Sequence, residues 1–154
     1  MELALERSLT PSSGTPGDSE GEEPESRLDI SVVFTTVQPT IAALKMAATL
    51  ADPLSARITL VVPQVVPYPC PLTNPPVLPD FNETRFRAIA SESPAEIKVH
   101  LYLCREKWDA LTLALTRRPL VILGGRKAWW PTPEKRMARR LRRAGHEVIF
   151  AEME

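Results

Sequence analysis

The sequence predicts an α/β fold in which a parallel sheet carries helices on both faces. Five short stretches rich in Val, Ile and Leu have the length of strands, and four stretches with helical spacing of apolar residues lie between them. Strict alternation of strand and helix favours parallel strands joined by helical crossovers. The chain has 154 residues, 44% of them hydrophobic, which is enough for one domain with its own core.

The first 28 residues are expected to form a disordered acidic tail, and the folded domain to span residues 29–154. The tail contains seven acidic and two basic residues, a net charge of −5, so the formal net charge of zero is a cancellation against a domain of +5. After Leu9 the tail is rich in Ser, Gly, Pro and Glu and has almost nothing apolar to bury, which is typical of disorder. Residues 1–9 can form a helix, but it is too short to persist alone.

The first half of the domain is predicted to be two strands around one helix. Residues 30–35 are a β-branched apolar run that suits a strand covered on both faces. Residues 40–51 place their apolar side chains on one helical stripe, which Pro53 ends, and residues 57–62 form the second strand. Seven prolines between Pro63 and Pro79 exclude a helix or an internal strand there and predict an extended connection.

The second half is predicted to hold three helices and three strands. In the first of these strands, apolar residues alternate with polar ones, as expected near a sheet edge, whereas the second is apolar throughout and is broken by Gly124-Gly125. Thr132 can cap the last helix, and Gly145 can end it. In chain order, the elements are helix 80–90, strand 96–103, helix 105–116, strand 120–123, helix 133–144 and strand 146–151.

The two halves together resemble the universal stress protein family. The unit DISVVFTTVQPTIAALKMAATLAD, followed by ARITLVVPQVVP, is similar to the family's first strand, alanine-rich helix and valine-rich second strand. The stretch from IKVHLYLC to GHEVIFAE resembles the closing half, so the resemblance covers about residues 29–152. It implies a Rossmann-like, five-stranded parallel sheet in the order 3-2-1-4-5, with any ligand over the carboxyl ends of strands 1 and 4.

The resemblance also identifies where the family's ATP-binding members carry their motif. They have an Asp at the end of the first strand and a loop G-x2-G-x9-G-[S/T] after the fourth. In this sequence Thr35 stands at the Asp position, Gly124 matches the first glycine, and Lys127 stands at the second; the final pair falls near Met137-Ala138, which have no hydroxyl. We therefore expect a module that lacks the standard ATP motif and has no cofactor.

A non-standard nucleotide or anion site is an alternative. Gly124 and Gly125 precede Arg126 and Lys127, so an anion near Thr35 could meet two cationic side chains and the free N–H groups of the next helix. Trp129 and its neighbour Trp130 could stack on a base. The other interpretation is that the glycines end a strand in a tight turn and that the tryptophans pack as a lid over the sheet edge.

The last predicted helix is strongly basic. A solvated outer face is the favoured interpretation, because cations near a helix C-terminus are stabilised by the helix dipole and no nucleic-acid motif accompanies them. An electrostatic adaptor that binds nucleic acid or an acidic lipid surface is a second alternative, and a transient contact with the acidic tail a third. The arginines concerned are Arg136, Arg139, Arg140, Arg142 and Arg143.

The sequence predicts a regulatory or ligand-sensing protein and not an enzyme. Neither His100 nor His146 has a nucleophile placed beside it, and no metal-ligand spacing or paired-carboxylate motif occurs. Cys104 is either activated by a helix N-terminus or a small buried residue. The absence of a long apolar run and of a signal-peptide pattern predicts a cytoplasmic protein.

Expected partners follow from the resemblance. It implies a homodimer, which we expect to form through the edge of the last strand at Val148, Ile149 and Phe150, because an open strand edge offers unpaired backbone groups. A regulatory role also implies a protein partner, whose identity the sequence does not specify.

Overall fold

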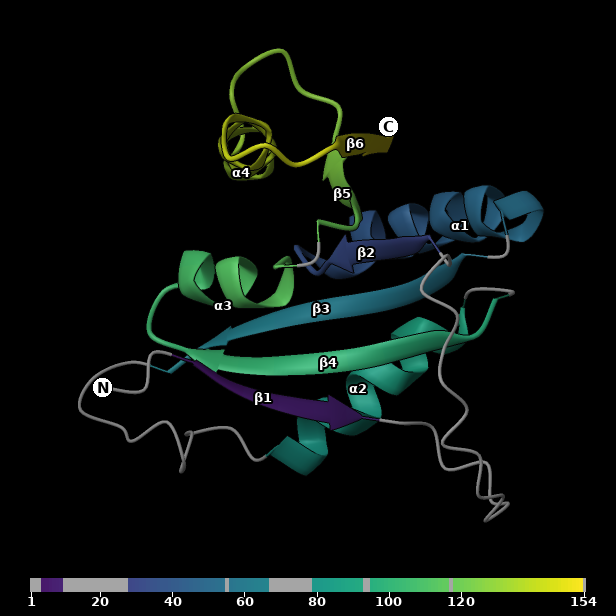
Figure 1. The fold of residues 1–154 in the computed structure, drawn as a ribbon, viewed down its shortest axis with the longest axis vertical. Helices are drawn as coiled ribbons and strands as arrows, with labels where there is room; N and C mark the ends of the chain where they lie inside the picture. Colours follow the sequence, from purple (N-terminus) through teal and green to yellow (C-terminus); the bar gives the residue numbers. More distant parts are fainter. Residues whose placement is uncertain are drawn as a thin grey trace.

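A six-stranded sheet runs through the molecule, with helices on both of its faces (Figure 1). The computed structural model describes residues 4–9, 28–54, 56–66, 79–92, 95–116 and 118–153. Its elements in chain order are β1 (Ala4–Leu9), β2 (Asp29–Val33), α1 (Val37–Leu54), β3 (Arg57–Val65), α2 (Pro79–Ser91), β4 (Ile97–Cys104), α3 (Lys107–Ala114), β5 (Leu120–Arg126), α4 (Pro133–Arg143) and β6 (Val148–Met153).

Five of the strands are parallel and confirm the predicted order. They lie in the order β4-β3-β2-β5-β6, which is 3-2-1-4-5 when the parallel strands are numbered along the chain. The neighbours β2 and β5 are central, with Ile30 opposite Leu120. The direction of chain travel across the sheet reverses at this pair, so the topological switch point lies at their carboxyl ends.

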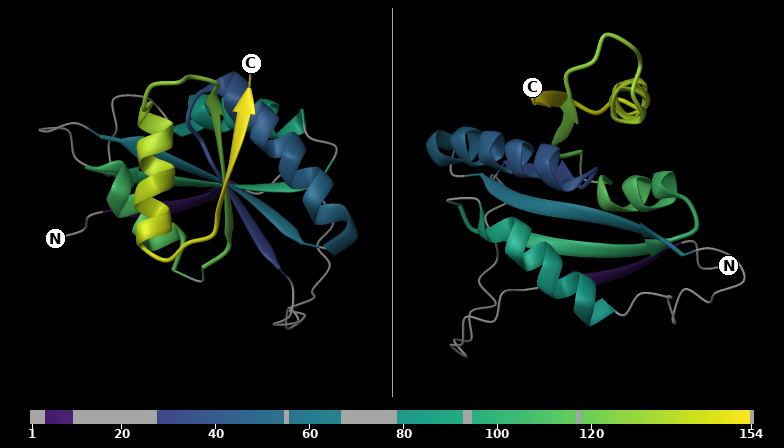
Figure 2. Two further views of the ribbon diagram at one scale, coloured as in Figure 1. Left: turned by 90° about the horizontal axis from the view of Figure 1, so that it is seen from above. Right: turned by 180° about the vertical axis from the view of Figure 1, so that it is seen from behind.

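The helices form two layers, one on each face of the sheet (Figure 2). Each layer covers a hydrophobic core. Helices α1 and α2 pack on one face, where Leu44 and Phe86 meet the side chains of the central strands. Helices α3 and α4 pack on the other face, where Leu111 and Leu141 cover Val61 and its neighbours. This arrangement follows from right-handed crossovers, which place successive helices on one face until the direction of travel reverses.

The start of the chain differs from the prediction of a disordered tail, because it contains the strand β1. Residues 1–28 were expected to be disordered, with a transient helix at most, but Ala4–Leu9 forms a strand that pairs antiparallel with β4. Without it, β4 would be an edge strand with eight residues of open backbone groups. Such an edge is a template for another strand, and local sequence patterns do not contain this information. The acidic residues 10–27 lie outside the described residues.

Two strands are also longer than the sequence predicted. Strand β3 continues through Pro63, which is opposite Tyr102 of β4, although proline was expected to exclude an internal strand. The reason is that β2 ends at Val33, so β3 has only one partner at that point and the missing N–H costs no ladder bond. Strand β5 likewise includes Gly124 and Gly125 instead of ending before them. Of the proline-rich connection, residues 67–78 lie outside the described residues.

Helix α4 has the ends that the sequence predicted. The backbone N–H of Lys135 donates to the hydroxyl of Thr132 at 3.2 Å, and Pro133 occupies the first turn. Gly145, with φ of 96°, takes the left-handed conformation that ends the helix. Helix α1, in contrast, runs past Pro53 to Leu54, where the sequence predicted it to end earlier.

Candidate functional site

The carboxyl ends of β2 and β5 bring two of the predicted site residues together. The hydroxyl of Thr35 donates to the carbonyl of Gly124 at 3.0 Å, and the backbone N–H of Thr35 donates to the hydroxyl of Thr40 at 3.2 Å. A Cβ atom at Gly124 would lie 1.9 Å from the carbonyl oxygen of Pro39. The glycine therefore lets the first turn of α1 lie directly against β5, and protein atoms occupy the space above this residue.

Gly125 faces the opposite side of the sheet, where it allows the ring of Phe150 to lie close to β5. A Cβ atom there would lie 2.3 Å from the end of the Phe150 ring. Phe150 packs against the core under α3 and α4. The two glycines are thus explained by close packing on both faces of β5, and not by the tight turn expected after the strand.

The loop after β5 carries the other predicted binding residues on the surface. Arg126 and Lys127 are exposed, and the side chains of Trp129 and Trp130 are 93% and 58% exposed. The two indole rings contact each other edge to face, with centroids 6.1 Å apart. The expectation of a lid over the sheet edge is wrong for these tryptophans, which project from the loop instead. The loop is tied to α4 by Lys135, whose ammonium group donates to the carbonyl of Ala128.

The basic helix α4 uses some of its arginines in the fold. The guanidinium of Arg140 lies over the ring of Trp108 in α3, 3.9 Å from its centroid. Arg142 donates to the carbonyl of Val148 at the start of β6, at 3.0 Å. The remaining predicted surface residues, Arg136, Arg139 and Arg143, are exposed.

The outer edge of β6 carries the residues expected at a dimer interface. Within the described chain, no strand pairs with this edge. The carbonyls of Glu147 and Met153 accept hydrogen bonds from the backbone N–H groups of Val121 in β5 and of Lys127 directly after it. Alternate residues of a strand direct their backbone groups to opposite sides, so the N–H groups of Phe150 and Glu152 point outward. The side chains of Val148, Ile149 and Phe150 are partly buried and pack against the two cores.

Cys104 is buried and has the character of a core residue. Its thiol donates to the carbonyl of Gln64 at 3.5 Å. Burial, and to a lesser extent the carboxylate of Asp109, raises the pKa of this thiol to about 11, against an opposing effect of Lys107. Of the two roles that the sequence left open, the structure therefore favours the small buried residue over the activated thiol.

Among the described residues no cluster of His, Cys, Asp and Glu could hold a metal ion, and no helix is long and apolar enough to cross a membrane.

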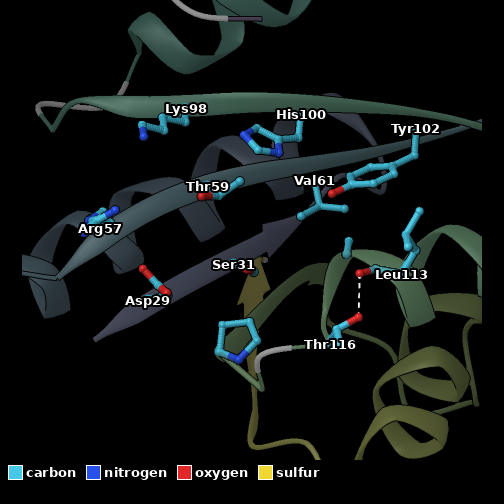
Figure 3. A pocket seen from close by; sticks show the side chains of 12 residues that line it. Asp29, Ser31, Arg57, Thr59, Val61, Lys98, His100, Tyr102, Leu113 and Thr116 are labelled. Atoms are coloured by element: carbon cyan, nitrogen blue, oxygen red, sulfur yellow. Dashed lines mark hydrogen bonds between the residues drawn. The ribbon is translucent and has the colours of Figure 1, made fainter. Parts of the chain in front are cut away.

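Sequence reasoning missed a polar cavity on the α3 side of the sheet. Its volume is about 410 Å³, and polar side chains from the first halves of β2, β3 and β4 form its floor (Figure 3). The C-terminal end of α3 and the following turn form one wall. We call this site the polar cavity. The residues that line it are Asp29, Ser31, Arg57, Thr59, Val61, Lys98, His100, Tyr102, Leu113, Ala114, Thr116 and Pro119.

The sequence contains a pattern that corresponds to this cavity. Three strands each place polar residues at alternating positions near their starts, namely Asp29 and Ser31, Arg57 and Thr59, and Lys98 and His100. The alternation of apolar and polar residues in 96–103 predicts a position near a sheet edge, but the sequence does not show that the polar faces of three strands are neighbours. The strand order makes them so.

Comparisons with known proteins agree with the fold. No family model matches the sequence, and no curated protein matches it. Among solved structures, the universal stress protein from Archaeoglobus fulgidus is similar with a TM-score of 0.60 and 17% identity, over 80% of this chain and 92% of that one. A protein of the universal stress protein family from Burkholderia pseudomallei is similar with a TM-score of 0.54 and 20% identity, over 82% of this chain and 98% of that one. The chain therefore has the universal stress protein fold, and in this chain the antiparallel strand β1 extends the five-stranded parallel sheet.

Proposed function

We propose that this protein is a non-catalytic regulatory module that senses a ligand without the standard ATP-binding mode of its fold. The observation that carries the proposal is the contact of Gly124 with the first turn of α1. The carbonyl of Pro39 occupies the space beside Gly124, and the Thr35 hydroxyl is engaged by the Gly124 carbonyl. A phosphate would need this backbone to be open, because close approach to free N–H groups is how such loops bind phosphate.

Calorimetry with ATP and AMP tests this proposal. We expect no heat of binding above dilution and no change in the melting temperature of the protein with either nucleotide. Prolonged incubation with ATP should also release no phosphate. Saturable binding of ATP at one site per chain would contradict the proposal.

A second candidate is a nucleotide-binding function of the exposed loop. The observation that favours it is the 93% exposure of Trp129 next to two exposed cations, Arg126 and Lys127. An exposed indole is available to stack on a base, and such stacking contributes about 1–3 kcal/mol per base. On this hypothesis Trp129→Ala weakens nucleotide binding roughly tenfold, whereas Trp130→Ala weakens it less. Equal binding by the wild type and Trp129→Ala would contradict it.

An electrostatic adaptor function rests on the exposed arginines of α4. Because Arg140 and Arg142 have contacts within the fold, a fair test changes only Arg136, Arg139 and Arg143 to Glu. If the helix binds nucleic acid or acidic vesicles, the affinity of the wild type falls steeply with salt, and the triple variant loses it. Binding that is independent of salt would contradict this function.

The proposal includes a homodimer in the cytoplasm. The outward N–H groups of Phe150 and Glu152 support pairing of two β6 edges, since an open edge is a template for a second strand. Imaging of a fluorescent fusion tests the location, and a fusion at the cell envelope would contradict it.

A further inference from the structure

The floor of the polar cavity is a regular grid of side chains on three neighbouring strands. In the pairing of β2 with β3, Asp29 is opposite Arg57 and Ser31 is opposite Thr59. In the pairing of β3 with β4, Thr59 is opposite Lys98. Figure 3 shows these side chains rising from the same face of the sheet. The first rows of this face are therefore charged or hydroxylated.

The rows closer to the carboxyl ends of the strands are apolar instead. There Val61, Tyr102 and Cys104 are buried against α3 and α4. Burial along β4 changes accordingly: Lys98 is exposed and His100 is intermediate, but every residue from Leu101 onward is buried. Within the described residues, one face of the same sheet thus has an apolar half that α3 and α4 cover and a polar half that is less buried.

The short length of α3 is the reason that this half is less buried. Eight helical residues rise about 12 Å, whereas the eight residues of β4 extend about 26 Å, so the helix covers less than half of the strand. The chain then turns at Thr116, whose hydroxyl donates to the carbonyl of Leu113 at 2.8 Å, and enters β5 after Pro119. This turn closes one side of the cavity. Within the described residues, Lys98 of the floor is exposed, Asp29, Arg57 and Thr59 are half-buried, and Ser31 is buried.

The lining determines which chemistry the cavity can recognise. Arg57 and Lys98 provide two cationic groups, and Asp29 provides one carboxylate. The hydroxyls of Ser31, Thr59 and Thr116 can each donate and accept. A volume of 410 Å³ is in the lower part of the range of small-molecule sites. The wall residues Leu113 and Ala114 are aliphatic, and β4 adds the rings of His100 and Tyr102. The hydroxyls and the two cations can therefore hold a polar anion, and the aliphatic and aromatic side chains can hold its carbon skeleton.

We propose that the polar cavity binds a small sugar phosphate. Its phosphate lies between the guanidinium of Arg57 and the ammonium of Lys98, and its hydroxyls bind Asp29, Ser31 and Thr59. A phosphate monoester carries nearly two negative charges at neutral pH and so matches two cations. This inference deepens the ligand-sensing role proposed above and rests on it, but it uses the starts of the strands and none of the residues at the switch point.

The experiment is a titration of the ¹⁵N-labelled full chain with four probes: glucose 6-phosphate, inorganic phosphate, glucose and ATP. We expect glucose 6-phosphate to shift the backbone amide signals at the starts of β2, β3 and β4, and to bind at least tenfold more tightly than phosphate or glucose alone. In Lys98→Gln this affinity falls about tenfold, because a hydrogen bond to a charged group is lost. Lys45→Gln is the matched control: it removes an exposed lysine from α1, on the opposite face, and leaves the affinity unchanged.

Three results would overturn the inference. The first is no shift of these amide signals with any probe, and the second is equal affinity for glucose 6-phosphate and inorganic phosphate. The third is equal weakening by Lys98→Gln and Lys45→Gln, which would indicate a diffuse charge effect. Failure of the proposed function has a different signature, since ATP would then shift signals of Gly124 and its neighbours and would bind equally to Lys98→Gln.

Discussion

The guanidinium carbon of Arg140 lies 3.9 Å from the centroid of the Trp108 ring, and this contact joins α4 to α3. The two helices lie on the same face of the sheet and share a hydrophobic core beneath them. An arginine that the sequence assigned to a basic surface therefore also packs on an aromatic ring. Its loss should affect the stability of the fold as well as the charge of the helix.

Replacing Arg140 with Ala should lower the free energy of unfolding by about 1 kcal/mol, the usual contribution of a cation–π pair that is partly exposed. Urea denaturation followed by circular dichroism measures this. Arg139→Ala, which removes an exposed neighbour of the same charge, should cost less than half as much. Equal effects of the two variants would show that the contact with Trp108 contributes no stability.

The two glycines of β5 should respond differently to a methyl group. Gly124→Ala should destabilise the protein by about 3 kcal/mol or more, because the obstacle is the backbone carbonyl of Pro39, which cannot move without shifting α1. Gly125→Ala should cost about 1–2 kcal/mol, because the end of the Phe150 ring can move. Denaturant unfolding of both variants tests the order.

Phe150→Leu provides a control for these glycines. A shorter side chain opens space at Gly125 and not at Gly124, so Phe150→Leu should partly rescue Gly125→Ala and have no such effect on Gly124→Ala. Equal rescue of both variants would contradict the assignment of the two glycines to opposite faces of β5.

Cys104 should make the stability of the protein depend on pH in the alkaline range. Burial raises the pKa of the thiol from 9.0 to about 11, so between these values the folded state keeps a proton that the unfolded state loses. The resulting stabilisation is fully present below about pH 9 and is lost as the pH rises toward 11, an effect of up to about 3 kcal/mol. Urea midpoints measured from pH 8 to 11 should fall more steeply for the wild type than for Cys104→Ala. Parallel curves would mean that the thiol does not cause the loss.

Glu152→Pro should separate a dimer formed by β6 into monomers. The substitution removes an outward N–H at an exposed position and leaves the bonds from β6 to β5 in place. Light scattering after size exclusion, at micromolar concentration, should report a dimer for the wild type and a monomer for the variant. Glu152→Ala keeps the N–H and should remain dimeric. A monomeric wild type would exclude this interface.

Most of the helices and strands follow from local sequence patterns. The apolar run in β2, the stripe that places Leu44 in the core, and the cap of α4 at Thr132 each depend on neighbours in sequence. Strand β1 and the continuation of β3 through Pro63 do not follow from such local patterns. Each depends on which neighbouring strand offers backbone groups for pairing. The predicted order of the parallel strands came from the family resemblance and the central position of the most apolar strands, and it is correct.

The candidate site could be predicted from the sequence only in part. The sequence identified Gly124 and Gly125 as unusual, but only their neighbours in space, Pro39 and Phe150, show that they serve packing. It also identified an alternating polar face in residues 96–103, but the polar cavity needs two further strands beside it and a helix too short to cover it.

The sequence by itself determined the alternation of strands and helices, the ends of α4 and the segregation of acidic and basic residues. These properties depend on residues a few positions apart, within reach of one turn or one strand. Only the tertiary structure decided that Thr35 engages Gly124 and that Asp29, Arg57 and Lys98 share one cavity. Such contacts join residues far apart in the chain, and the packing of strands and helices brings them together.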